Sequence, residues 1–148
     1  MLPNRSPRIV RILVMALLLV AAAGAARAGS RQLVESSRVQ TLTPQEVLEI
    51  LLSGEGPVII DCRNSRQYAE GHIPGAINVF HKDTWGRLKE LRRLERERGI
   101  VYYDLKGVQS RVASGAVLAE GFRKVGVMEG HFSEWQRLGY PIAQGAPE

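Results

Sequence analysis

Cysteine is nearly absent from this sequence, since Cys62 is the only one in 148 residues. A single thiol excludes an intramolecular disulfide and a cysteine-based metal cage. A lone thiol in an oxidising compartment is best protected by burial. Cys62 lies between Asp61 and Arg63 at the end of an expected strand, and we interpret it as a small buried filler of the core. Its use as a nucleophile is the alternative, and that would require an accessible side chain with a lowered pKa.

A hydrophobic run long enough to span a membrane is also missing. Residues 12–26 form an uncharged run of 15 residues, whereas a spanning helix needs about 20. Three arginines precede the run, and Ala26-Arg27-Ala28 follows it, which is the pattern of an export signal cleaved after Ala28. We therefore expect residues 1–28 to be a signal peptide and the protein to be periplasmic or secreted. A retained N-terminal membrane anchor is the alternative.

The chain has almost no net charge once the expected signal peptide is removed. The whole chain has 20 Lys and Arg against 15 Asp and Glu, and four of the basic residues lie in residues 1–28. The remaining charges nearly balance, so composition gives no case for a nucleic-acid or anionic-membrane partner. The expected partner is an unidentified protein or a small anion, with a membrane involved only if the N-terminal segment is retained. No cofactor and no metal are expected.

Helix and strand patterns alternate about five times between a polar lead-in (29–37) and a short tail (144–148). Alternation of this kind predicts one α/β domain with a parallel sheet that helices cover on both faces. The expected helices cover residues 44–53, 65–70, 85–98, 110–120 and 131–138, and the expected strands 38–42, 57–61, 76–80, 100–103 and 124–128. The helix positions assigned to the core include Leu88, Leu91, Leu94, Val112, Ala116 and Val117.

Three strings of residues match a known family. They are Val58-Ile59-Ile60-Asp61-Cys62-Arg63, then Gly71-His72-Ile73-Pro74-Gly75-Ala76, and finally Trp135 with Gly139-Tyr140-Pro141-Ile142. Over residues 38–143 the chain resembles the rhodanese-like domain. The resemblance implies a five-stranded parallel sheet with helices on both faces and a sulfurtransferase ancestry.

The loop after the fourth expected strand departs from the pattern of that family. Active members have Cys-x-x-Gly-x-Arg-Ser there, in which the Cys carries sulfur as a persulfide and the Arg helps to bind an anionic substrate. Here Asp104 replaces the Cys and Gln109 replaces the Arg, while Gly107 and Ser110 match. A carboxylate oxygen cannot hold a persulfide, so the expected protein lacks thiol-based activity. The complete active-site-like loop is Asp104, Leu105, Lys106, Gly107, Val108, Gln109 and Ser110.

Asp104 has two interpretations. Backbone N–H groups at the start of a helix form an anion site, and the carboxylate can fill that site from within. Alternatively, Asp104 and His131, with His81 or Asp83, form an unrecognised site for a metal or for acid–base chemistry. The family usually has a glycine at the position of His131.

Asp61, Arg63 and His131 are the expected neighbours of the loop. We expect Asp61 and Arg63 to be a structural pair, with Glu70 as a partner for Arg63, and His72 to hydrogen-bond the backbone. The expected function is that of an exported binding or accessory module. The alternative is a sulfurtransferase-family enzyme, acting on thiosulfate or a related sulfur donor, that uses Cys62 or a site of Asp104 and His131.

Overall fold

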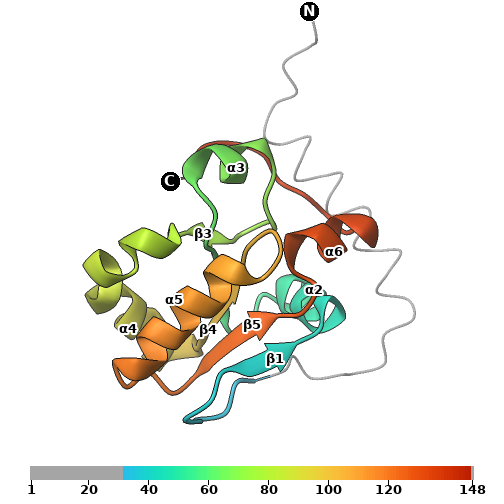
Figure 1. Cartoon of the computed structure of the whole chain (residues 1–148). Coiled ribbons are helices and arrows are strands. Elements are labelled where there is room, and N and C mark those ends of the chain that lie inside the picture. Colours follow the sequence, from blue (N-terminus) through green and yellow to red (C-terminus); the bar gives the residue numbers. More distant parts are fainter. Residues whose placement is uncertain (1–31, 148) are drawn as a thin grey trace, which may run out of the picture.

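The computed structural model describes residues 32–147, and the expected signal peptide lies outside this range. Five parallel strands form one sheet in the order β1-β5-β4-β2-β3, which confirms the predicted architecture (Figure 1). The strands are β1 (Gln40–Leu42), β2 (Val58–Asp61), β3 (Ile77–Asn78), β4 (Ile100–Tyr103) and β5 (Val125–Met128). The helices are α2 (Pro44–Ser53), α3 (Ser65–Glu70), α4 (Leu88–Arg98), α5 (Val108–Ala119) and α6 (His131–Arg137).

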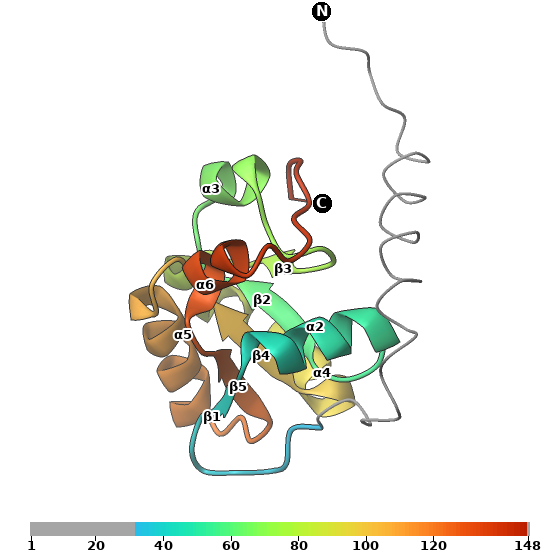
Figure 2. The same cartoon turned by 90° about the vertical axis from the view of Figure 1, so that its right-hand side faces the viewer.

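Helices cover both faces of the sheet, as Figure 2 shows with α2 and α5 on opposite sides. One apolar cluster includes Val47 of α2 and Trp135 of α6, and the other includes Leu91 of α4 and Val117 of α5. Because all strands are parallel, their carboxyl ends meet at one edge of the sheet. The loops that follow β2, β4 and β5 therefore lie close together there.

The start of α2 follows the predicted signals. The side chain of Thr43 accepts a hydrogen bond from the Glu46 N–H, and the Glu46 carboxylate accepts one from the Thr43 N–H. Pro44 occupies the first turn, where its missing N–H costs nothing. Gly54 ends the helix in the left-handed conformation, with φ of 68°.

Several boundaries differ from the prediction. Two 3₁₀ turns, residues 81–83 and 85–87, precede α4, which begins only at residue 88 because Arg87 has a φ of −111° and interrupts the helix. Helix α5 begins at residue 108, two residues earlier than expected, because Gly107 adopts the left-handed conformation directly before it. Strand β3 contains two residues and β1 three, so both edge strands are shorter than predicted.

The assignment of Val112 to the core is wrong. Its side chain is 58% exposed, and that of Val108 is 73% exposed. Helix α5 buries the opposite face, which consists of Ser110, Ala113, Ser114 and Val117. With 3.6 residues per turn, Val112 lies with Val108 on the solvent side of this helix.

The folded part begins earlier than the polar lead-in suggested. Leu33 is buried in the core cluster that contains Val47, and the Ser36 N–H donates to the Arg123 carbonyl at 2.9 Å. Among residues 32–147, no helix has the length and apolar character needed to cross a bilayer.

A buried charge network joins β2, β4 and the turn after α3. The Arg63 backbone N–H, Nε and Nη2 all donate to the Asp61 carboxylate, and Nη2 also donates to the Gly71 carbonyl. The Tyr103 hydroxyl donates to Asp61 at 2.6 Å. Asp61 and Arg63 therefore form the expected structural pair. The expected partnership of Arg63 with Glu70 is wrong, because Glu70 lies at the surface and pairs with Arg66, one helical turn away.

We expect Asp61→Ala to lower the free energy of unfolding by about 3–5 kcal/mol, because it leaves the Arg63 guanidinium buried without its counter-charge. Urea denaturation followed by circular dichroism measures this loss. Arg66→Ala removes an exposed pair and should change stability little. Equal effects of the two variants would show that the network contributes no more than a surface ion pair.

Candidate functional site

The carboxylate of Asp104 fills the loop between β4 and α5. Its Oδ1 accepts a hydrogen bond from the Gly107 N–H, and its Oδ2 accepts from the N–H groups of Gln109 and Ser110. The residue is only 2% exposed. Three amides at the amino end of α5 thus point at one internal anion, as the first interpretation of Asp104 predicted.

Helix α6 fastens the same loop from the other side. The Phe132 N–H donates to the Asp104 carbonyl at 2.9 Å, and the Ser133 hydroxyl donates to the Leu105 carbonyl at 2.8 Å. The first N–H groups of a helix have no partner within the helix. Here the N–H groups of Phe132 and Ser133 bind the backbone of the loop, so α6 sets the position of the loop.

His131 covers the loop at its glycine. It is the one non-glycine residue with positive φ among residues 32–147, at 54°. Its Nδ1 lies 3.5 Å from Oδ1 of Asp104. A Cβ built at Gly107 would lie 2.3 Å from Nε2 of His131, so a side chain at position 107 would collide with the ring. Gly107 is therefore required both by this approach and by its own φ of 96°.

The imidazole of His131 is largely buried between the loop and the cavity beside it. Its Nδ1 is buried and has no hydrogen-bond partner among the described residues. Burial lowers the pKa of His131, and the charge of Arg111 lowers it further, while the nearby Asp104 carboxylate opposes both effects. The ring is therefore neutral near pH 7 and packs on the loop without an ion pair to Asp104.

Arg63 is not free to bind a ligand. Its guanidinium is held by Asp61 and lies 4.0 Å from the centre of the Phe132 ring. Burial opposes its charge, but the hydrogen bonds to Asp61 and the charge of Asp61 outweigh this and raise the pKa of Arg63. Its role is to position α6 and the turn after α3.

Cys62 lies on the other face of the sheet from Asp61. It is completely buried in the cluster that contains Ile60 and Val117. Burial raises the pKa of the Cys62 thiol, and the charges of Asp61 and Asp104 raise it further. Thiolate formation, which nucleophilic chemistry needs, is therefore suppressed.

The remaining predicted neighbours do not converge on Asp104. The Nδ1 of His72 lies 2.8 Å from the Tyr68 carbonyl, so His72 binds the backbone as expected. His81 lies in a 3₁₀ turn, and its N–H donates to the Cys62 carbonyl. Over residues 32–147, no three His, Cys, Asp or Glu side chains are placed to share a metal ion. The described residues thus bring only His131 to Asp104.

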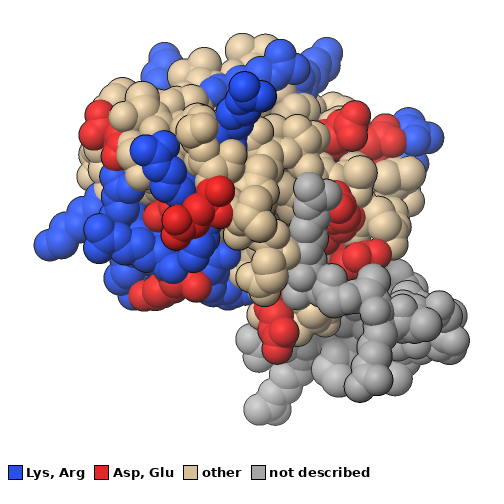
Figure 3. Space-filling view, turned by 90° about the horizontal axis from the view of Figure 1, so that it is seen from below, with Lys and Arg blue, Asp and Glu red and all other residues tan. Residues whose placement is uncertain are grey.

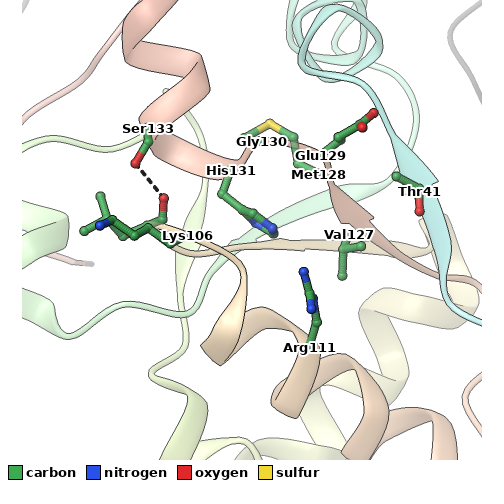
Figure 4. Close-up of a pocket in the computed structure, with 10 residues that line it drawn as sticks. Thr41, Lys106, Arg111, Val127, Met128, Glu129, Gly130, His131 and Ser133 are labelled. Carbon is green, nitrogen blue, oxygen red and sulfur yellow. Dashed lines mark hydrogen bonds between the residues drawn. The ribbon is translucent and has the colours of Figure 1, made fainter.

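A cavity of about 520 Å³ lies beside the loop (Figure 4). Its walls come from the loop, α5, the ends of β1 and β5, and the start of α6, and include Thr41, Lys106, Arg111, Val127, His131 and Ser133. Arg111 points across the cavity toward His131. No role for Arg111 was predicted from the sequence. Its place in the first turn of α5, four residues after Gly107, is the signal that locates it beside the loop.

Comparison with known proteins agrees with this fold. The family model described as "Rhodanese-like domain" matches residues 43–138. The thiosulfate sulfurtransferase GlpE of Actinobacillus pleuropneumoniae is 30% identical over 101 residues, which cover 68% of this chain and 90% of GlpE. The tRNA uridine(34) hydroxylase of Staphylococcus saprophyticus is 36% identical over 92 residues, which cover 60% of this chain and 29% of that protein.

A solved structure supports the same assignment. The solution structure of the rhodanese-like domain of Alr3790 from Anabaena is 26% identical, with a TM-score of 0.63, and the match covers 72% of this chain and 80% of that domain. The family model, the sulfurtransferase relative and the five-stranded sheet agree: the chain belongs to the rhodanese-like domain family.

Proposed function

We propose that this protein is an exported rhodanese-like domain that lacks thiol-based sulfurtransferase activity and acts as a binding or accessory module. The observation that carries the proposal is the Asp104 carboxylate, which is buried and accepts hydrogen bonds from three amides of its own loop. The anion site that a persulfide would use is already filled by a side chain that cannot carry sulfur.

Sulfur transfer from thiosulfate needs a thiolate. The thiolate attacks the outer sulfur of thiosulfate, sulfite leaves, and the resulting persulfide passes its sulfur to cyanide as thiocyanate, which regenerates the thiolate. Asp104 forms no such bond. Gln109 also brings no positive charge to the first turn of α5, where an anionic donor would need one.

No other thiol replaces the missing one. Cys62 is the only cysteine in the sequence, and it is completely buried with a raised pKa. Cys62 is also not among the residues that line the cavity beside the loop. The alternative of an enzyme that uses Cys62 is therefore disfavoured.

The surface around the filled loop supports a binding role. Leu105 is 38% exposed, and Val108 and Val112 of α5 are more exposed still. Lys106 and Arg111 are exposed beside them. Apolar side chains flanked by cations suit a protein partner that carries acidic residues.

We expect the wild-type protein to show no thiosulfate:cyanide sulfurtransferase activity above the uncatalysed rate. Asp104→Cys should introduce weak activity, and Asp104→Cys with Gln109→Arg should exceed it by about tenfold or more in kcat/KM, the effect of one added charge-assisted hydrogen bond. Thiocyanate formation by the purified full chain measures all three. Cys62→Ser is the matched control, because it removes the only native thiol.

Wild-type turnover that survives Cys62→Ser would contradict the proposal. It would show that the loop acts on sulfur donors without a thiolate. Wild-type turnover that Cys62→Ser abolishes would instead identify Cys62 as the nucleophile.

His131→Gly should raise the activity of the Asp104→Cys, Gln109→Arg protein further, because the imidazole that lies on Gly107 no longer covers the loop. Glycine also adopts the positive φ of this position without strain. The comparison of kcat/KM with and without His131→Gly measures the effect, and circular dichroism checks that the fold is retained. An unchanged or lower value would show that the ring does not limit access.

An export signal that is cleaved after Ala28 predicts a mature protein of defined mass and N-terminus. When the full chain is expressed in a Gram-negative bacterium, the mature protein should accumulate in the periplasmic fraction, and its N-terminal residue should be Gly29. Cell fractionation and intact-mass measurement check this. Ala28→Arg should block cleavage, because the site requires a small residue there. An uncleaved wild-type chain in the membrane fraction would favour the N-terminal anchor.

A further inference from the structure

One face of α4 carries only cations. Lys89, Arg92, Arg93 and Arg96 recur at the spacing that places residues on the same side of a helix. The acidic residues of α4 do not lie on this face. Glu95 is buried, Glu90 pairs with Arg87, and Glu97 lies on a flank of this face at the helical period.

The turn before β5 extends the basic face. The Arg92 guanidinium lies 3.8 Å from the centre of the Phe122 ring. The buried Glu95 accepts hydrogen bonds from the N–H groups of Arg123 and Lys124 at 2.8 and 2.9 Å. These contacts hold the turn against α4. The basic face is then Lys89, Arg92, Arg93, Arg96, Arg123 and Lys124, and Figure 3 shows Lys and Arg side chains gathered on this side of the molecule.

The balanced composition conceals this separation of charge. Residues 87–98 and 120–124 contain eight basic and four acidic residues, whereas the rest of the described chain contains seven basic and ten acidic residues. A net charge near zero argues against a polyanionic partner only when positive and negative side chains are evenly mixed over the surface. In this structure the positive side chains are concentrated on the basic face.

An exposed tryptophan accompanies the basic face. Trp85 lies in the 3₁₀ turn that directly precedes α4 and is 57% exposed. Its large apolar ring is unusual at a protein surface, and tryptophan is enriched where proteins meet the headgroup region of a bilayer. The second tryptophan, Trp135, is completely buried.

The chain enters the fold beside the basic face. The Ser36 N–H binds the Arg123 carbonyl, and the side chain of Leu33 approaches Gly99, which follows α4 directly. The first described residues therefore lie beside the turn that contains Arg123 and Lys124, at the amino edge of the sheet.

We propose that the basic face and Trp85 bind an anionic phospholipid bilayer. Each Lys or Arg near such a surface contributes attraction to the headgroups, and the tryptophan ring inserts at the level of the headgroups. The exposed Trp85 ring favours a membrane over a nucleic acid, which the same charges could otherwise bind. This proposal does not depend on the sulfur chemistry of the loop.

The test uses protein purified from cells that express the full chain. It is mixed with vesicles of phosphatidylcholine alone or with about one quarter phosphatidylglycerol, at about 0.1 M salt, where surface charges are only partly screened. We expect cosedimentation and a shift of tryptophan emission to shorter wavelength with the anionic vesicles alone. Because Trp135 is buried, Trp85→Phe should remove the shift.

Paired variants separate the basic face from total charge. Arg93→Gln with Arg96→Gln should weaken binding to the anionic vesicles about 30-fold, from the typical contribution of one Lys or Arg at a membrane surface. Arg66→Gln with Arg137→Gln removes the same charge from α3 and α6, at the other edge of the sheet, and should leave binding within about twofold.

Three results would overturn the proposal. Equal binding to phosphatidylcholine vesicles would show that the charges are not responsible. Equal loss in the two paired variants would show that the basic face is not the contact surface. Tighter binding to a short DNA duplex than to the anionic vesicles at the same salt would assign the face to nucleic acid.

Discussion

The hydrogen bonds from the loop amides to the Asp104 carboxylate determine how the rest of the site is built. Three backbone N–H groups at the amino end of α5 point at one place, where a negative charge is favourable. The Asp104 carboxylate occupies that place and accepts a hydrogen bond from each of them. That arrangement requires the left-handed Gly107, and Gly107 in turn allows the ring of His131 to lie directly on the loop. The loop is consequently closed, ordered and complete without a ligand.

The buried pair of Asp61 and Arg63 fixes the position of this loop relative to the sheet. Arg63 packs on Phe132, and the Phe132 N–H binds the Asp104 carbonyl, so a charge at the end of β2 fixes the start of α6 and through it the loop after β4. An arginine so engaged cannot also bind an anionic substrate. Asp61 and Arg63, which belong to one of the family motifs, thus have a structural role in this chain.

The sequence predicted those features that depend on local patterns. The sheet, the start of α2 and the pairing of Asp61 with Arg63 all follow from short strings of residues. It did not predict the exposure of Val112, because an apolar residue on a helix belongs to the core only if its face meets the sheet. It also could not show that His131 lies on Gly107 or that α4 separates its charges, since both depend on where distant segments meet.

The filled loop and the turn that extends the basic face lie at opposite edges of the sheet. This separation bears on how the domain would be oriented on a membrane. The filled loop is at the carboxyl edge, whereas the turn that contains Arg123 and Lys124 is at the amino edge, where the chain enters the fold (Figure 1). Helix α4 runs between these two edges, because the 3₁₀ turn before it is bound to the end of β3 through Arg87 and the Asn78 carbonyl, whereas Gly99 leads directly into β4. A domain held to a bilayer by the basic face and Trp85 would therefore lie with α4 along the membrane surface.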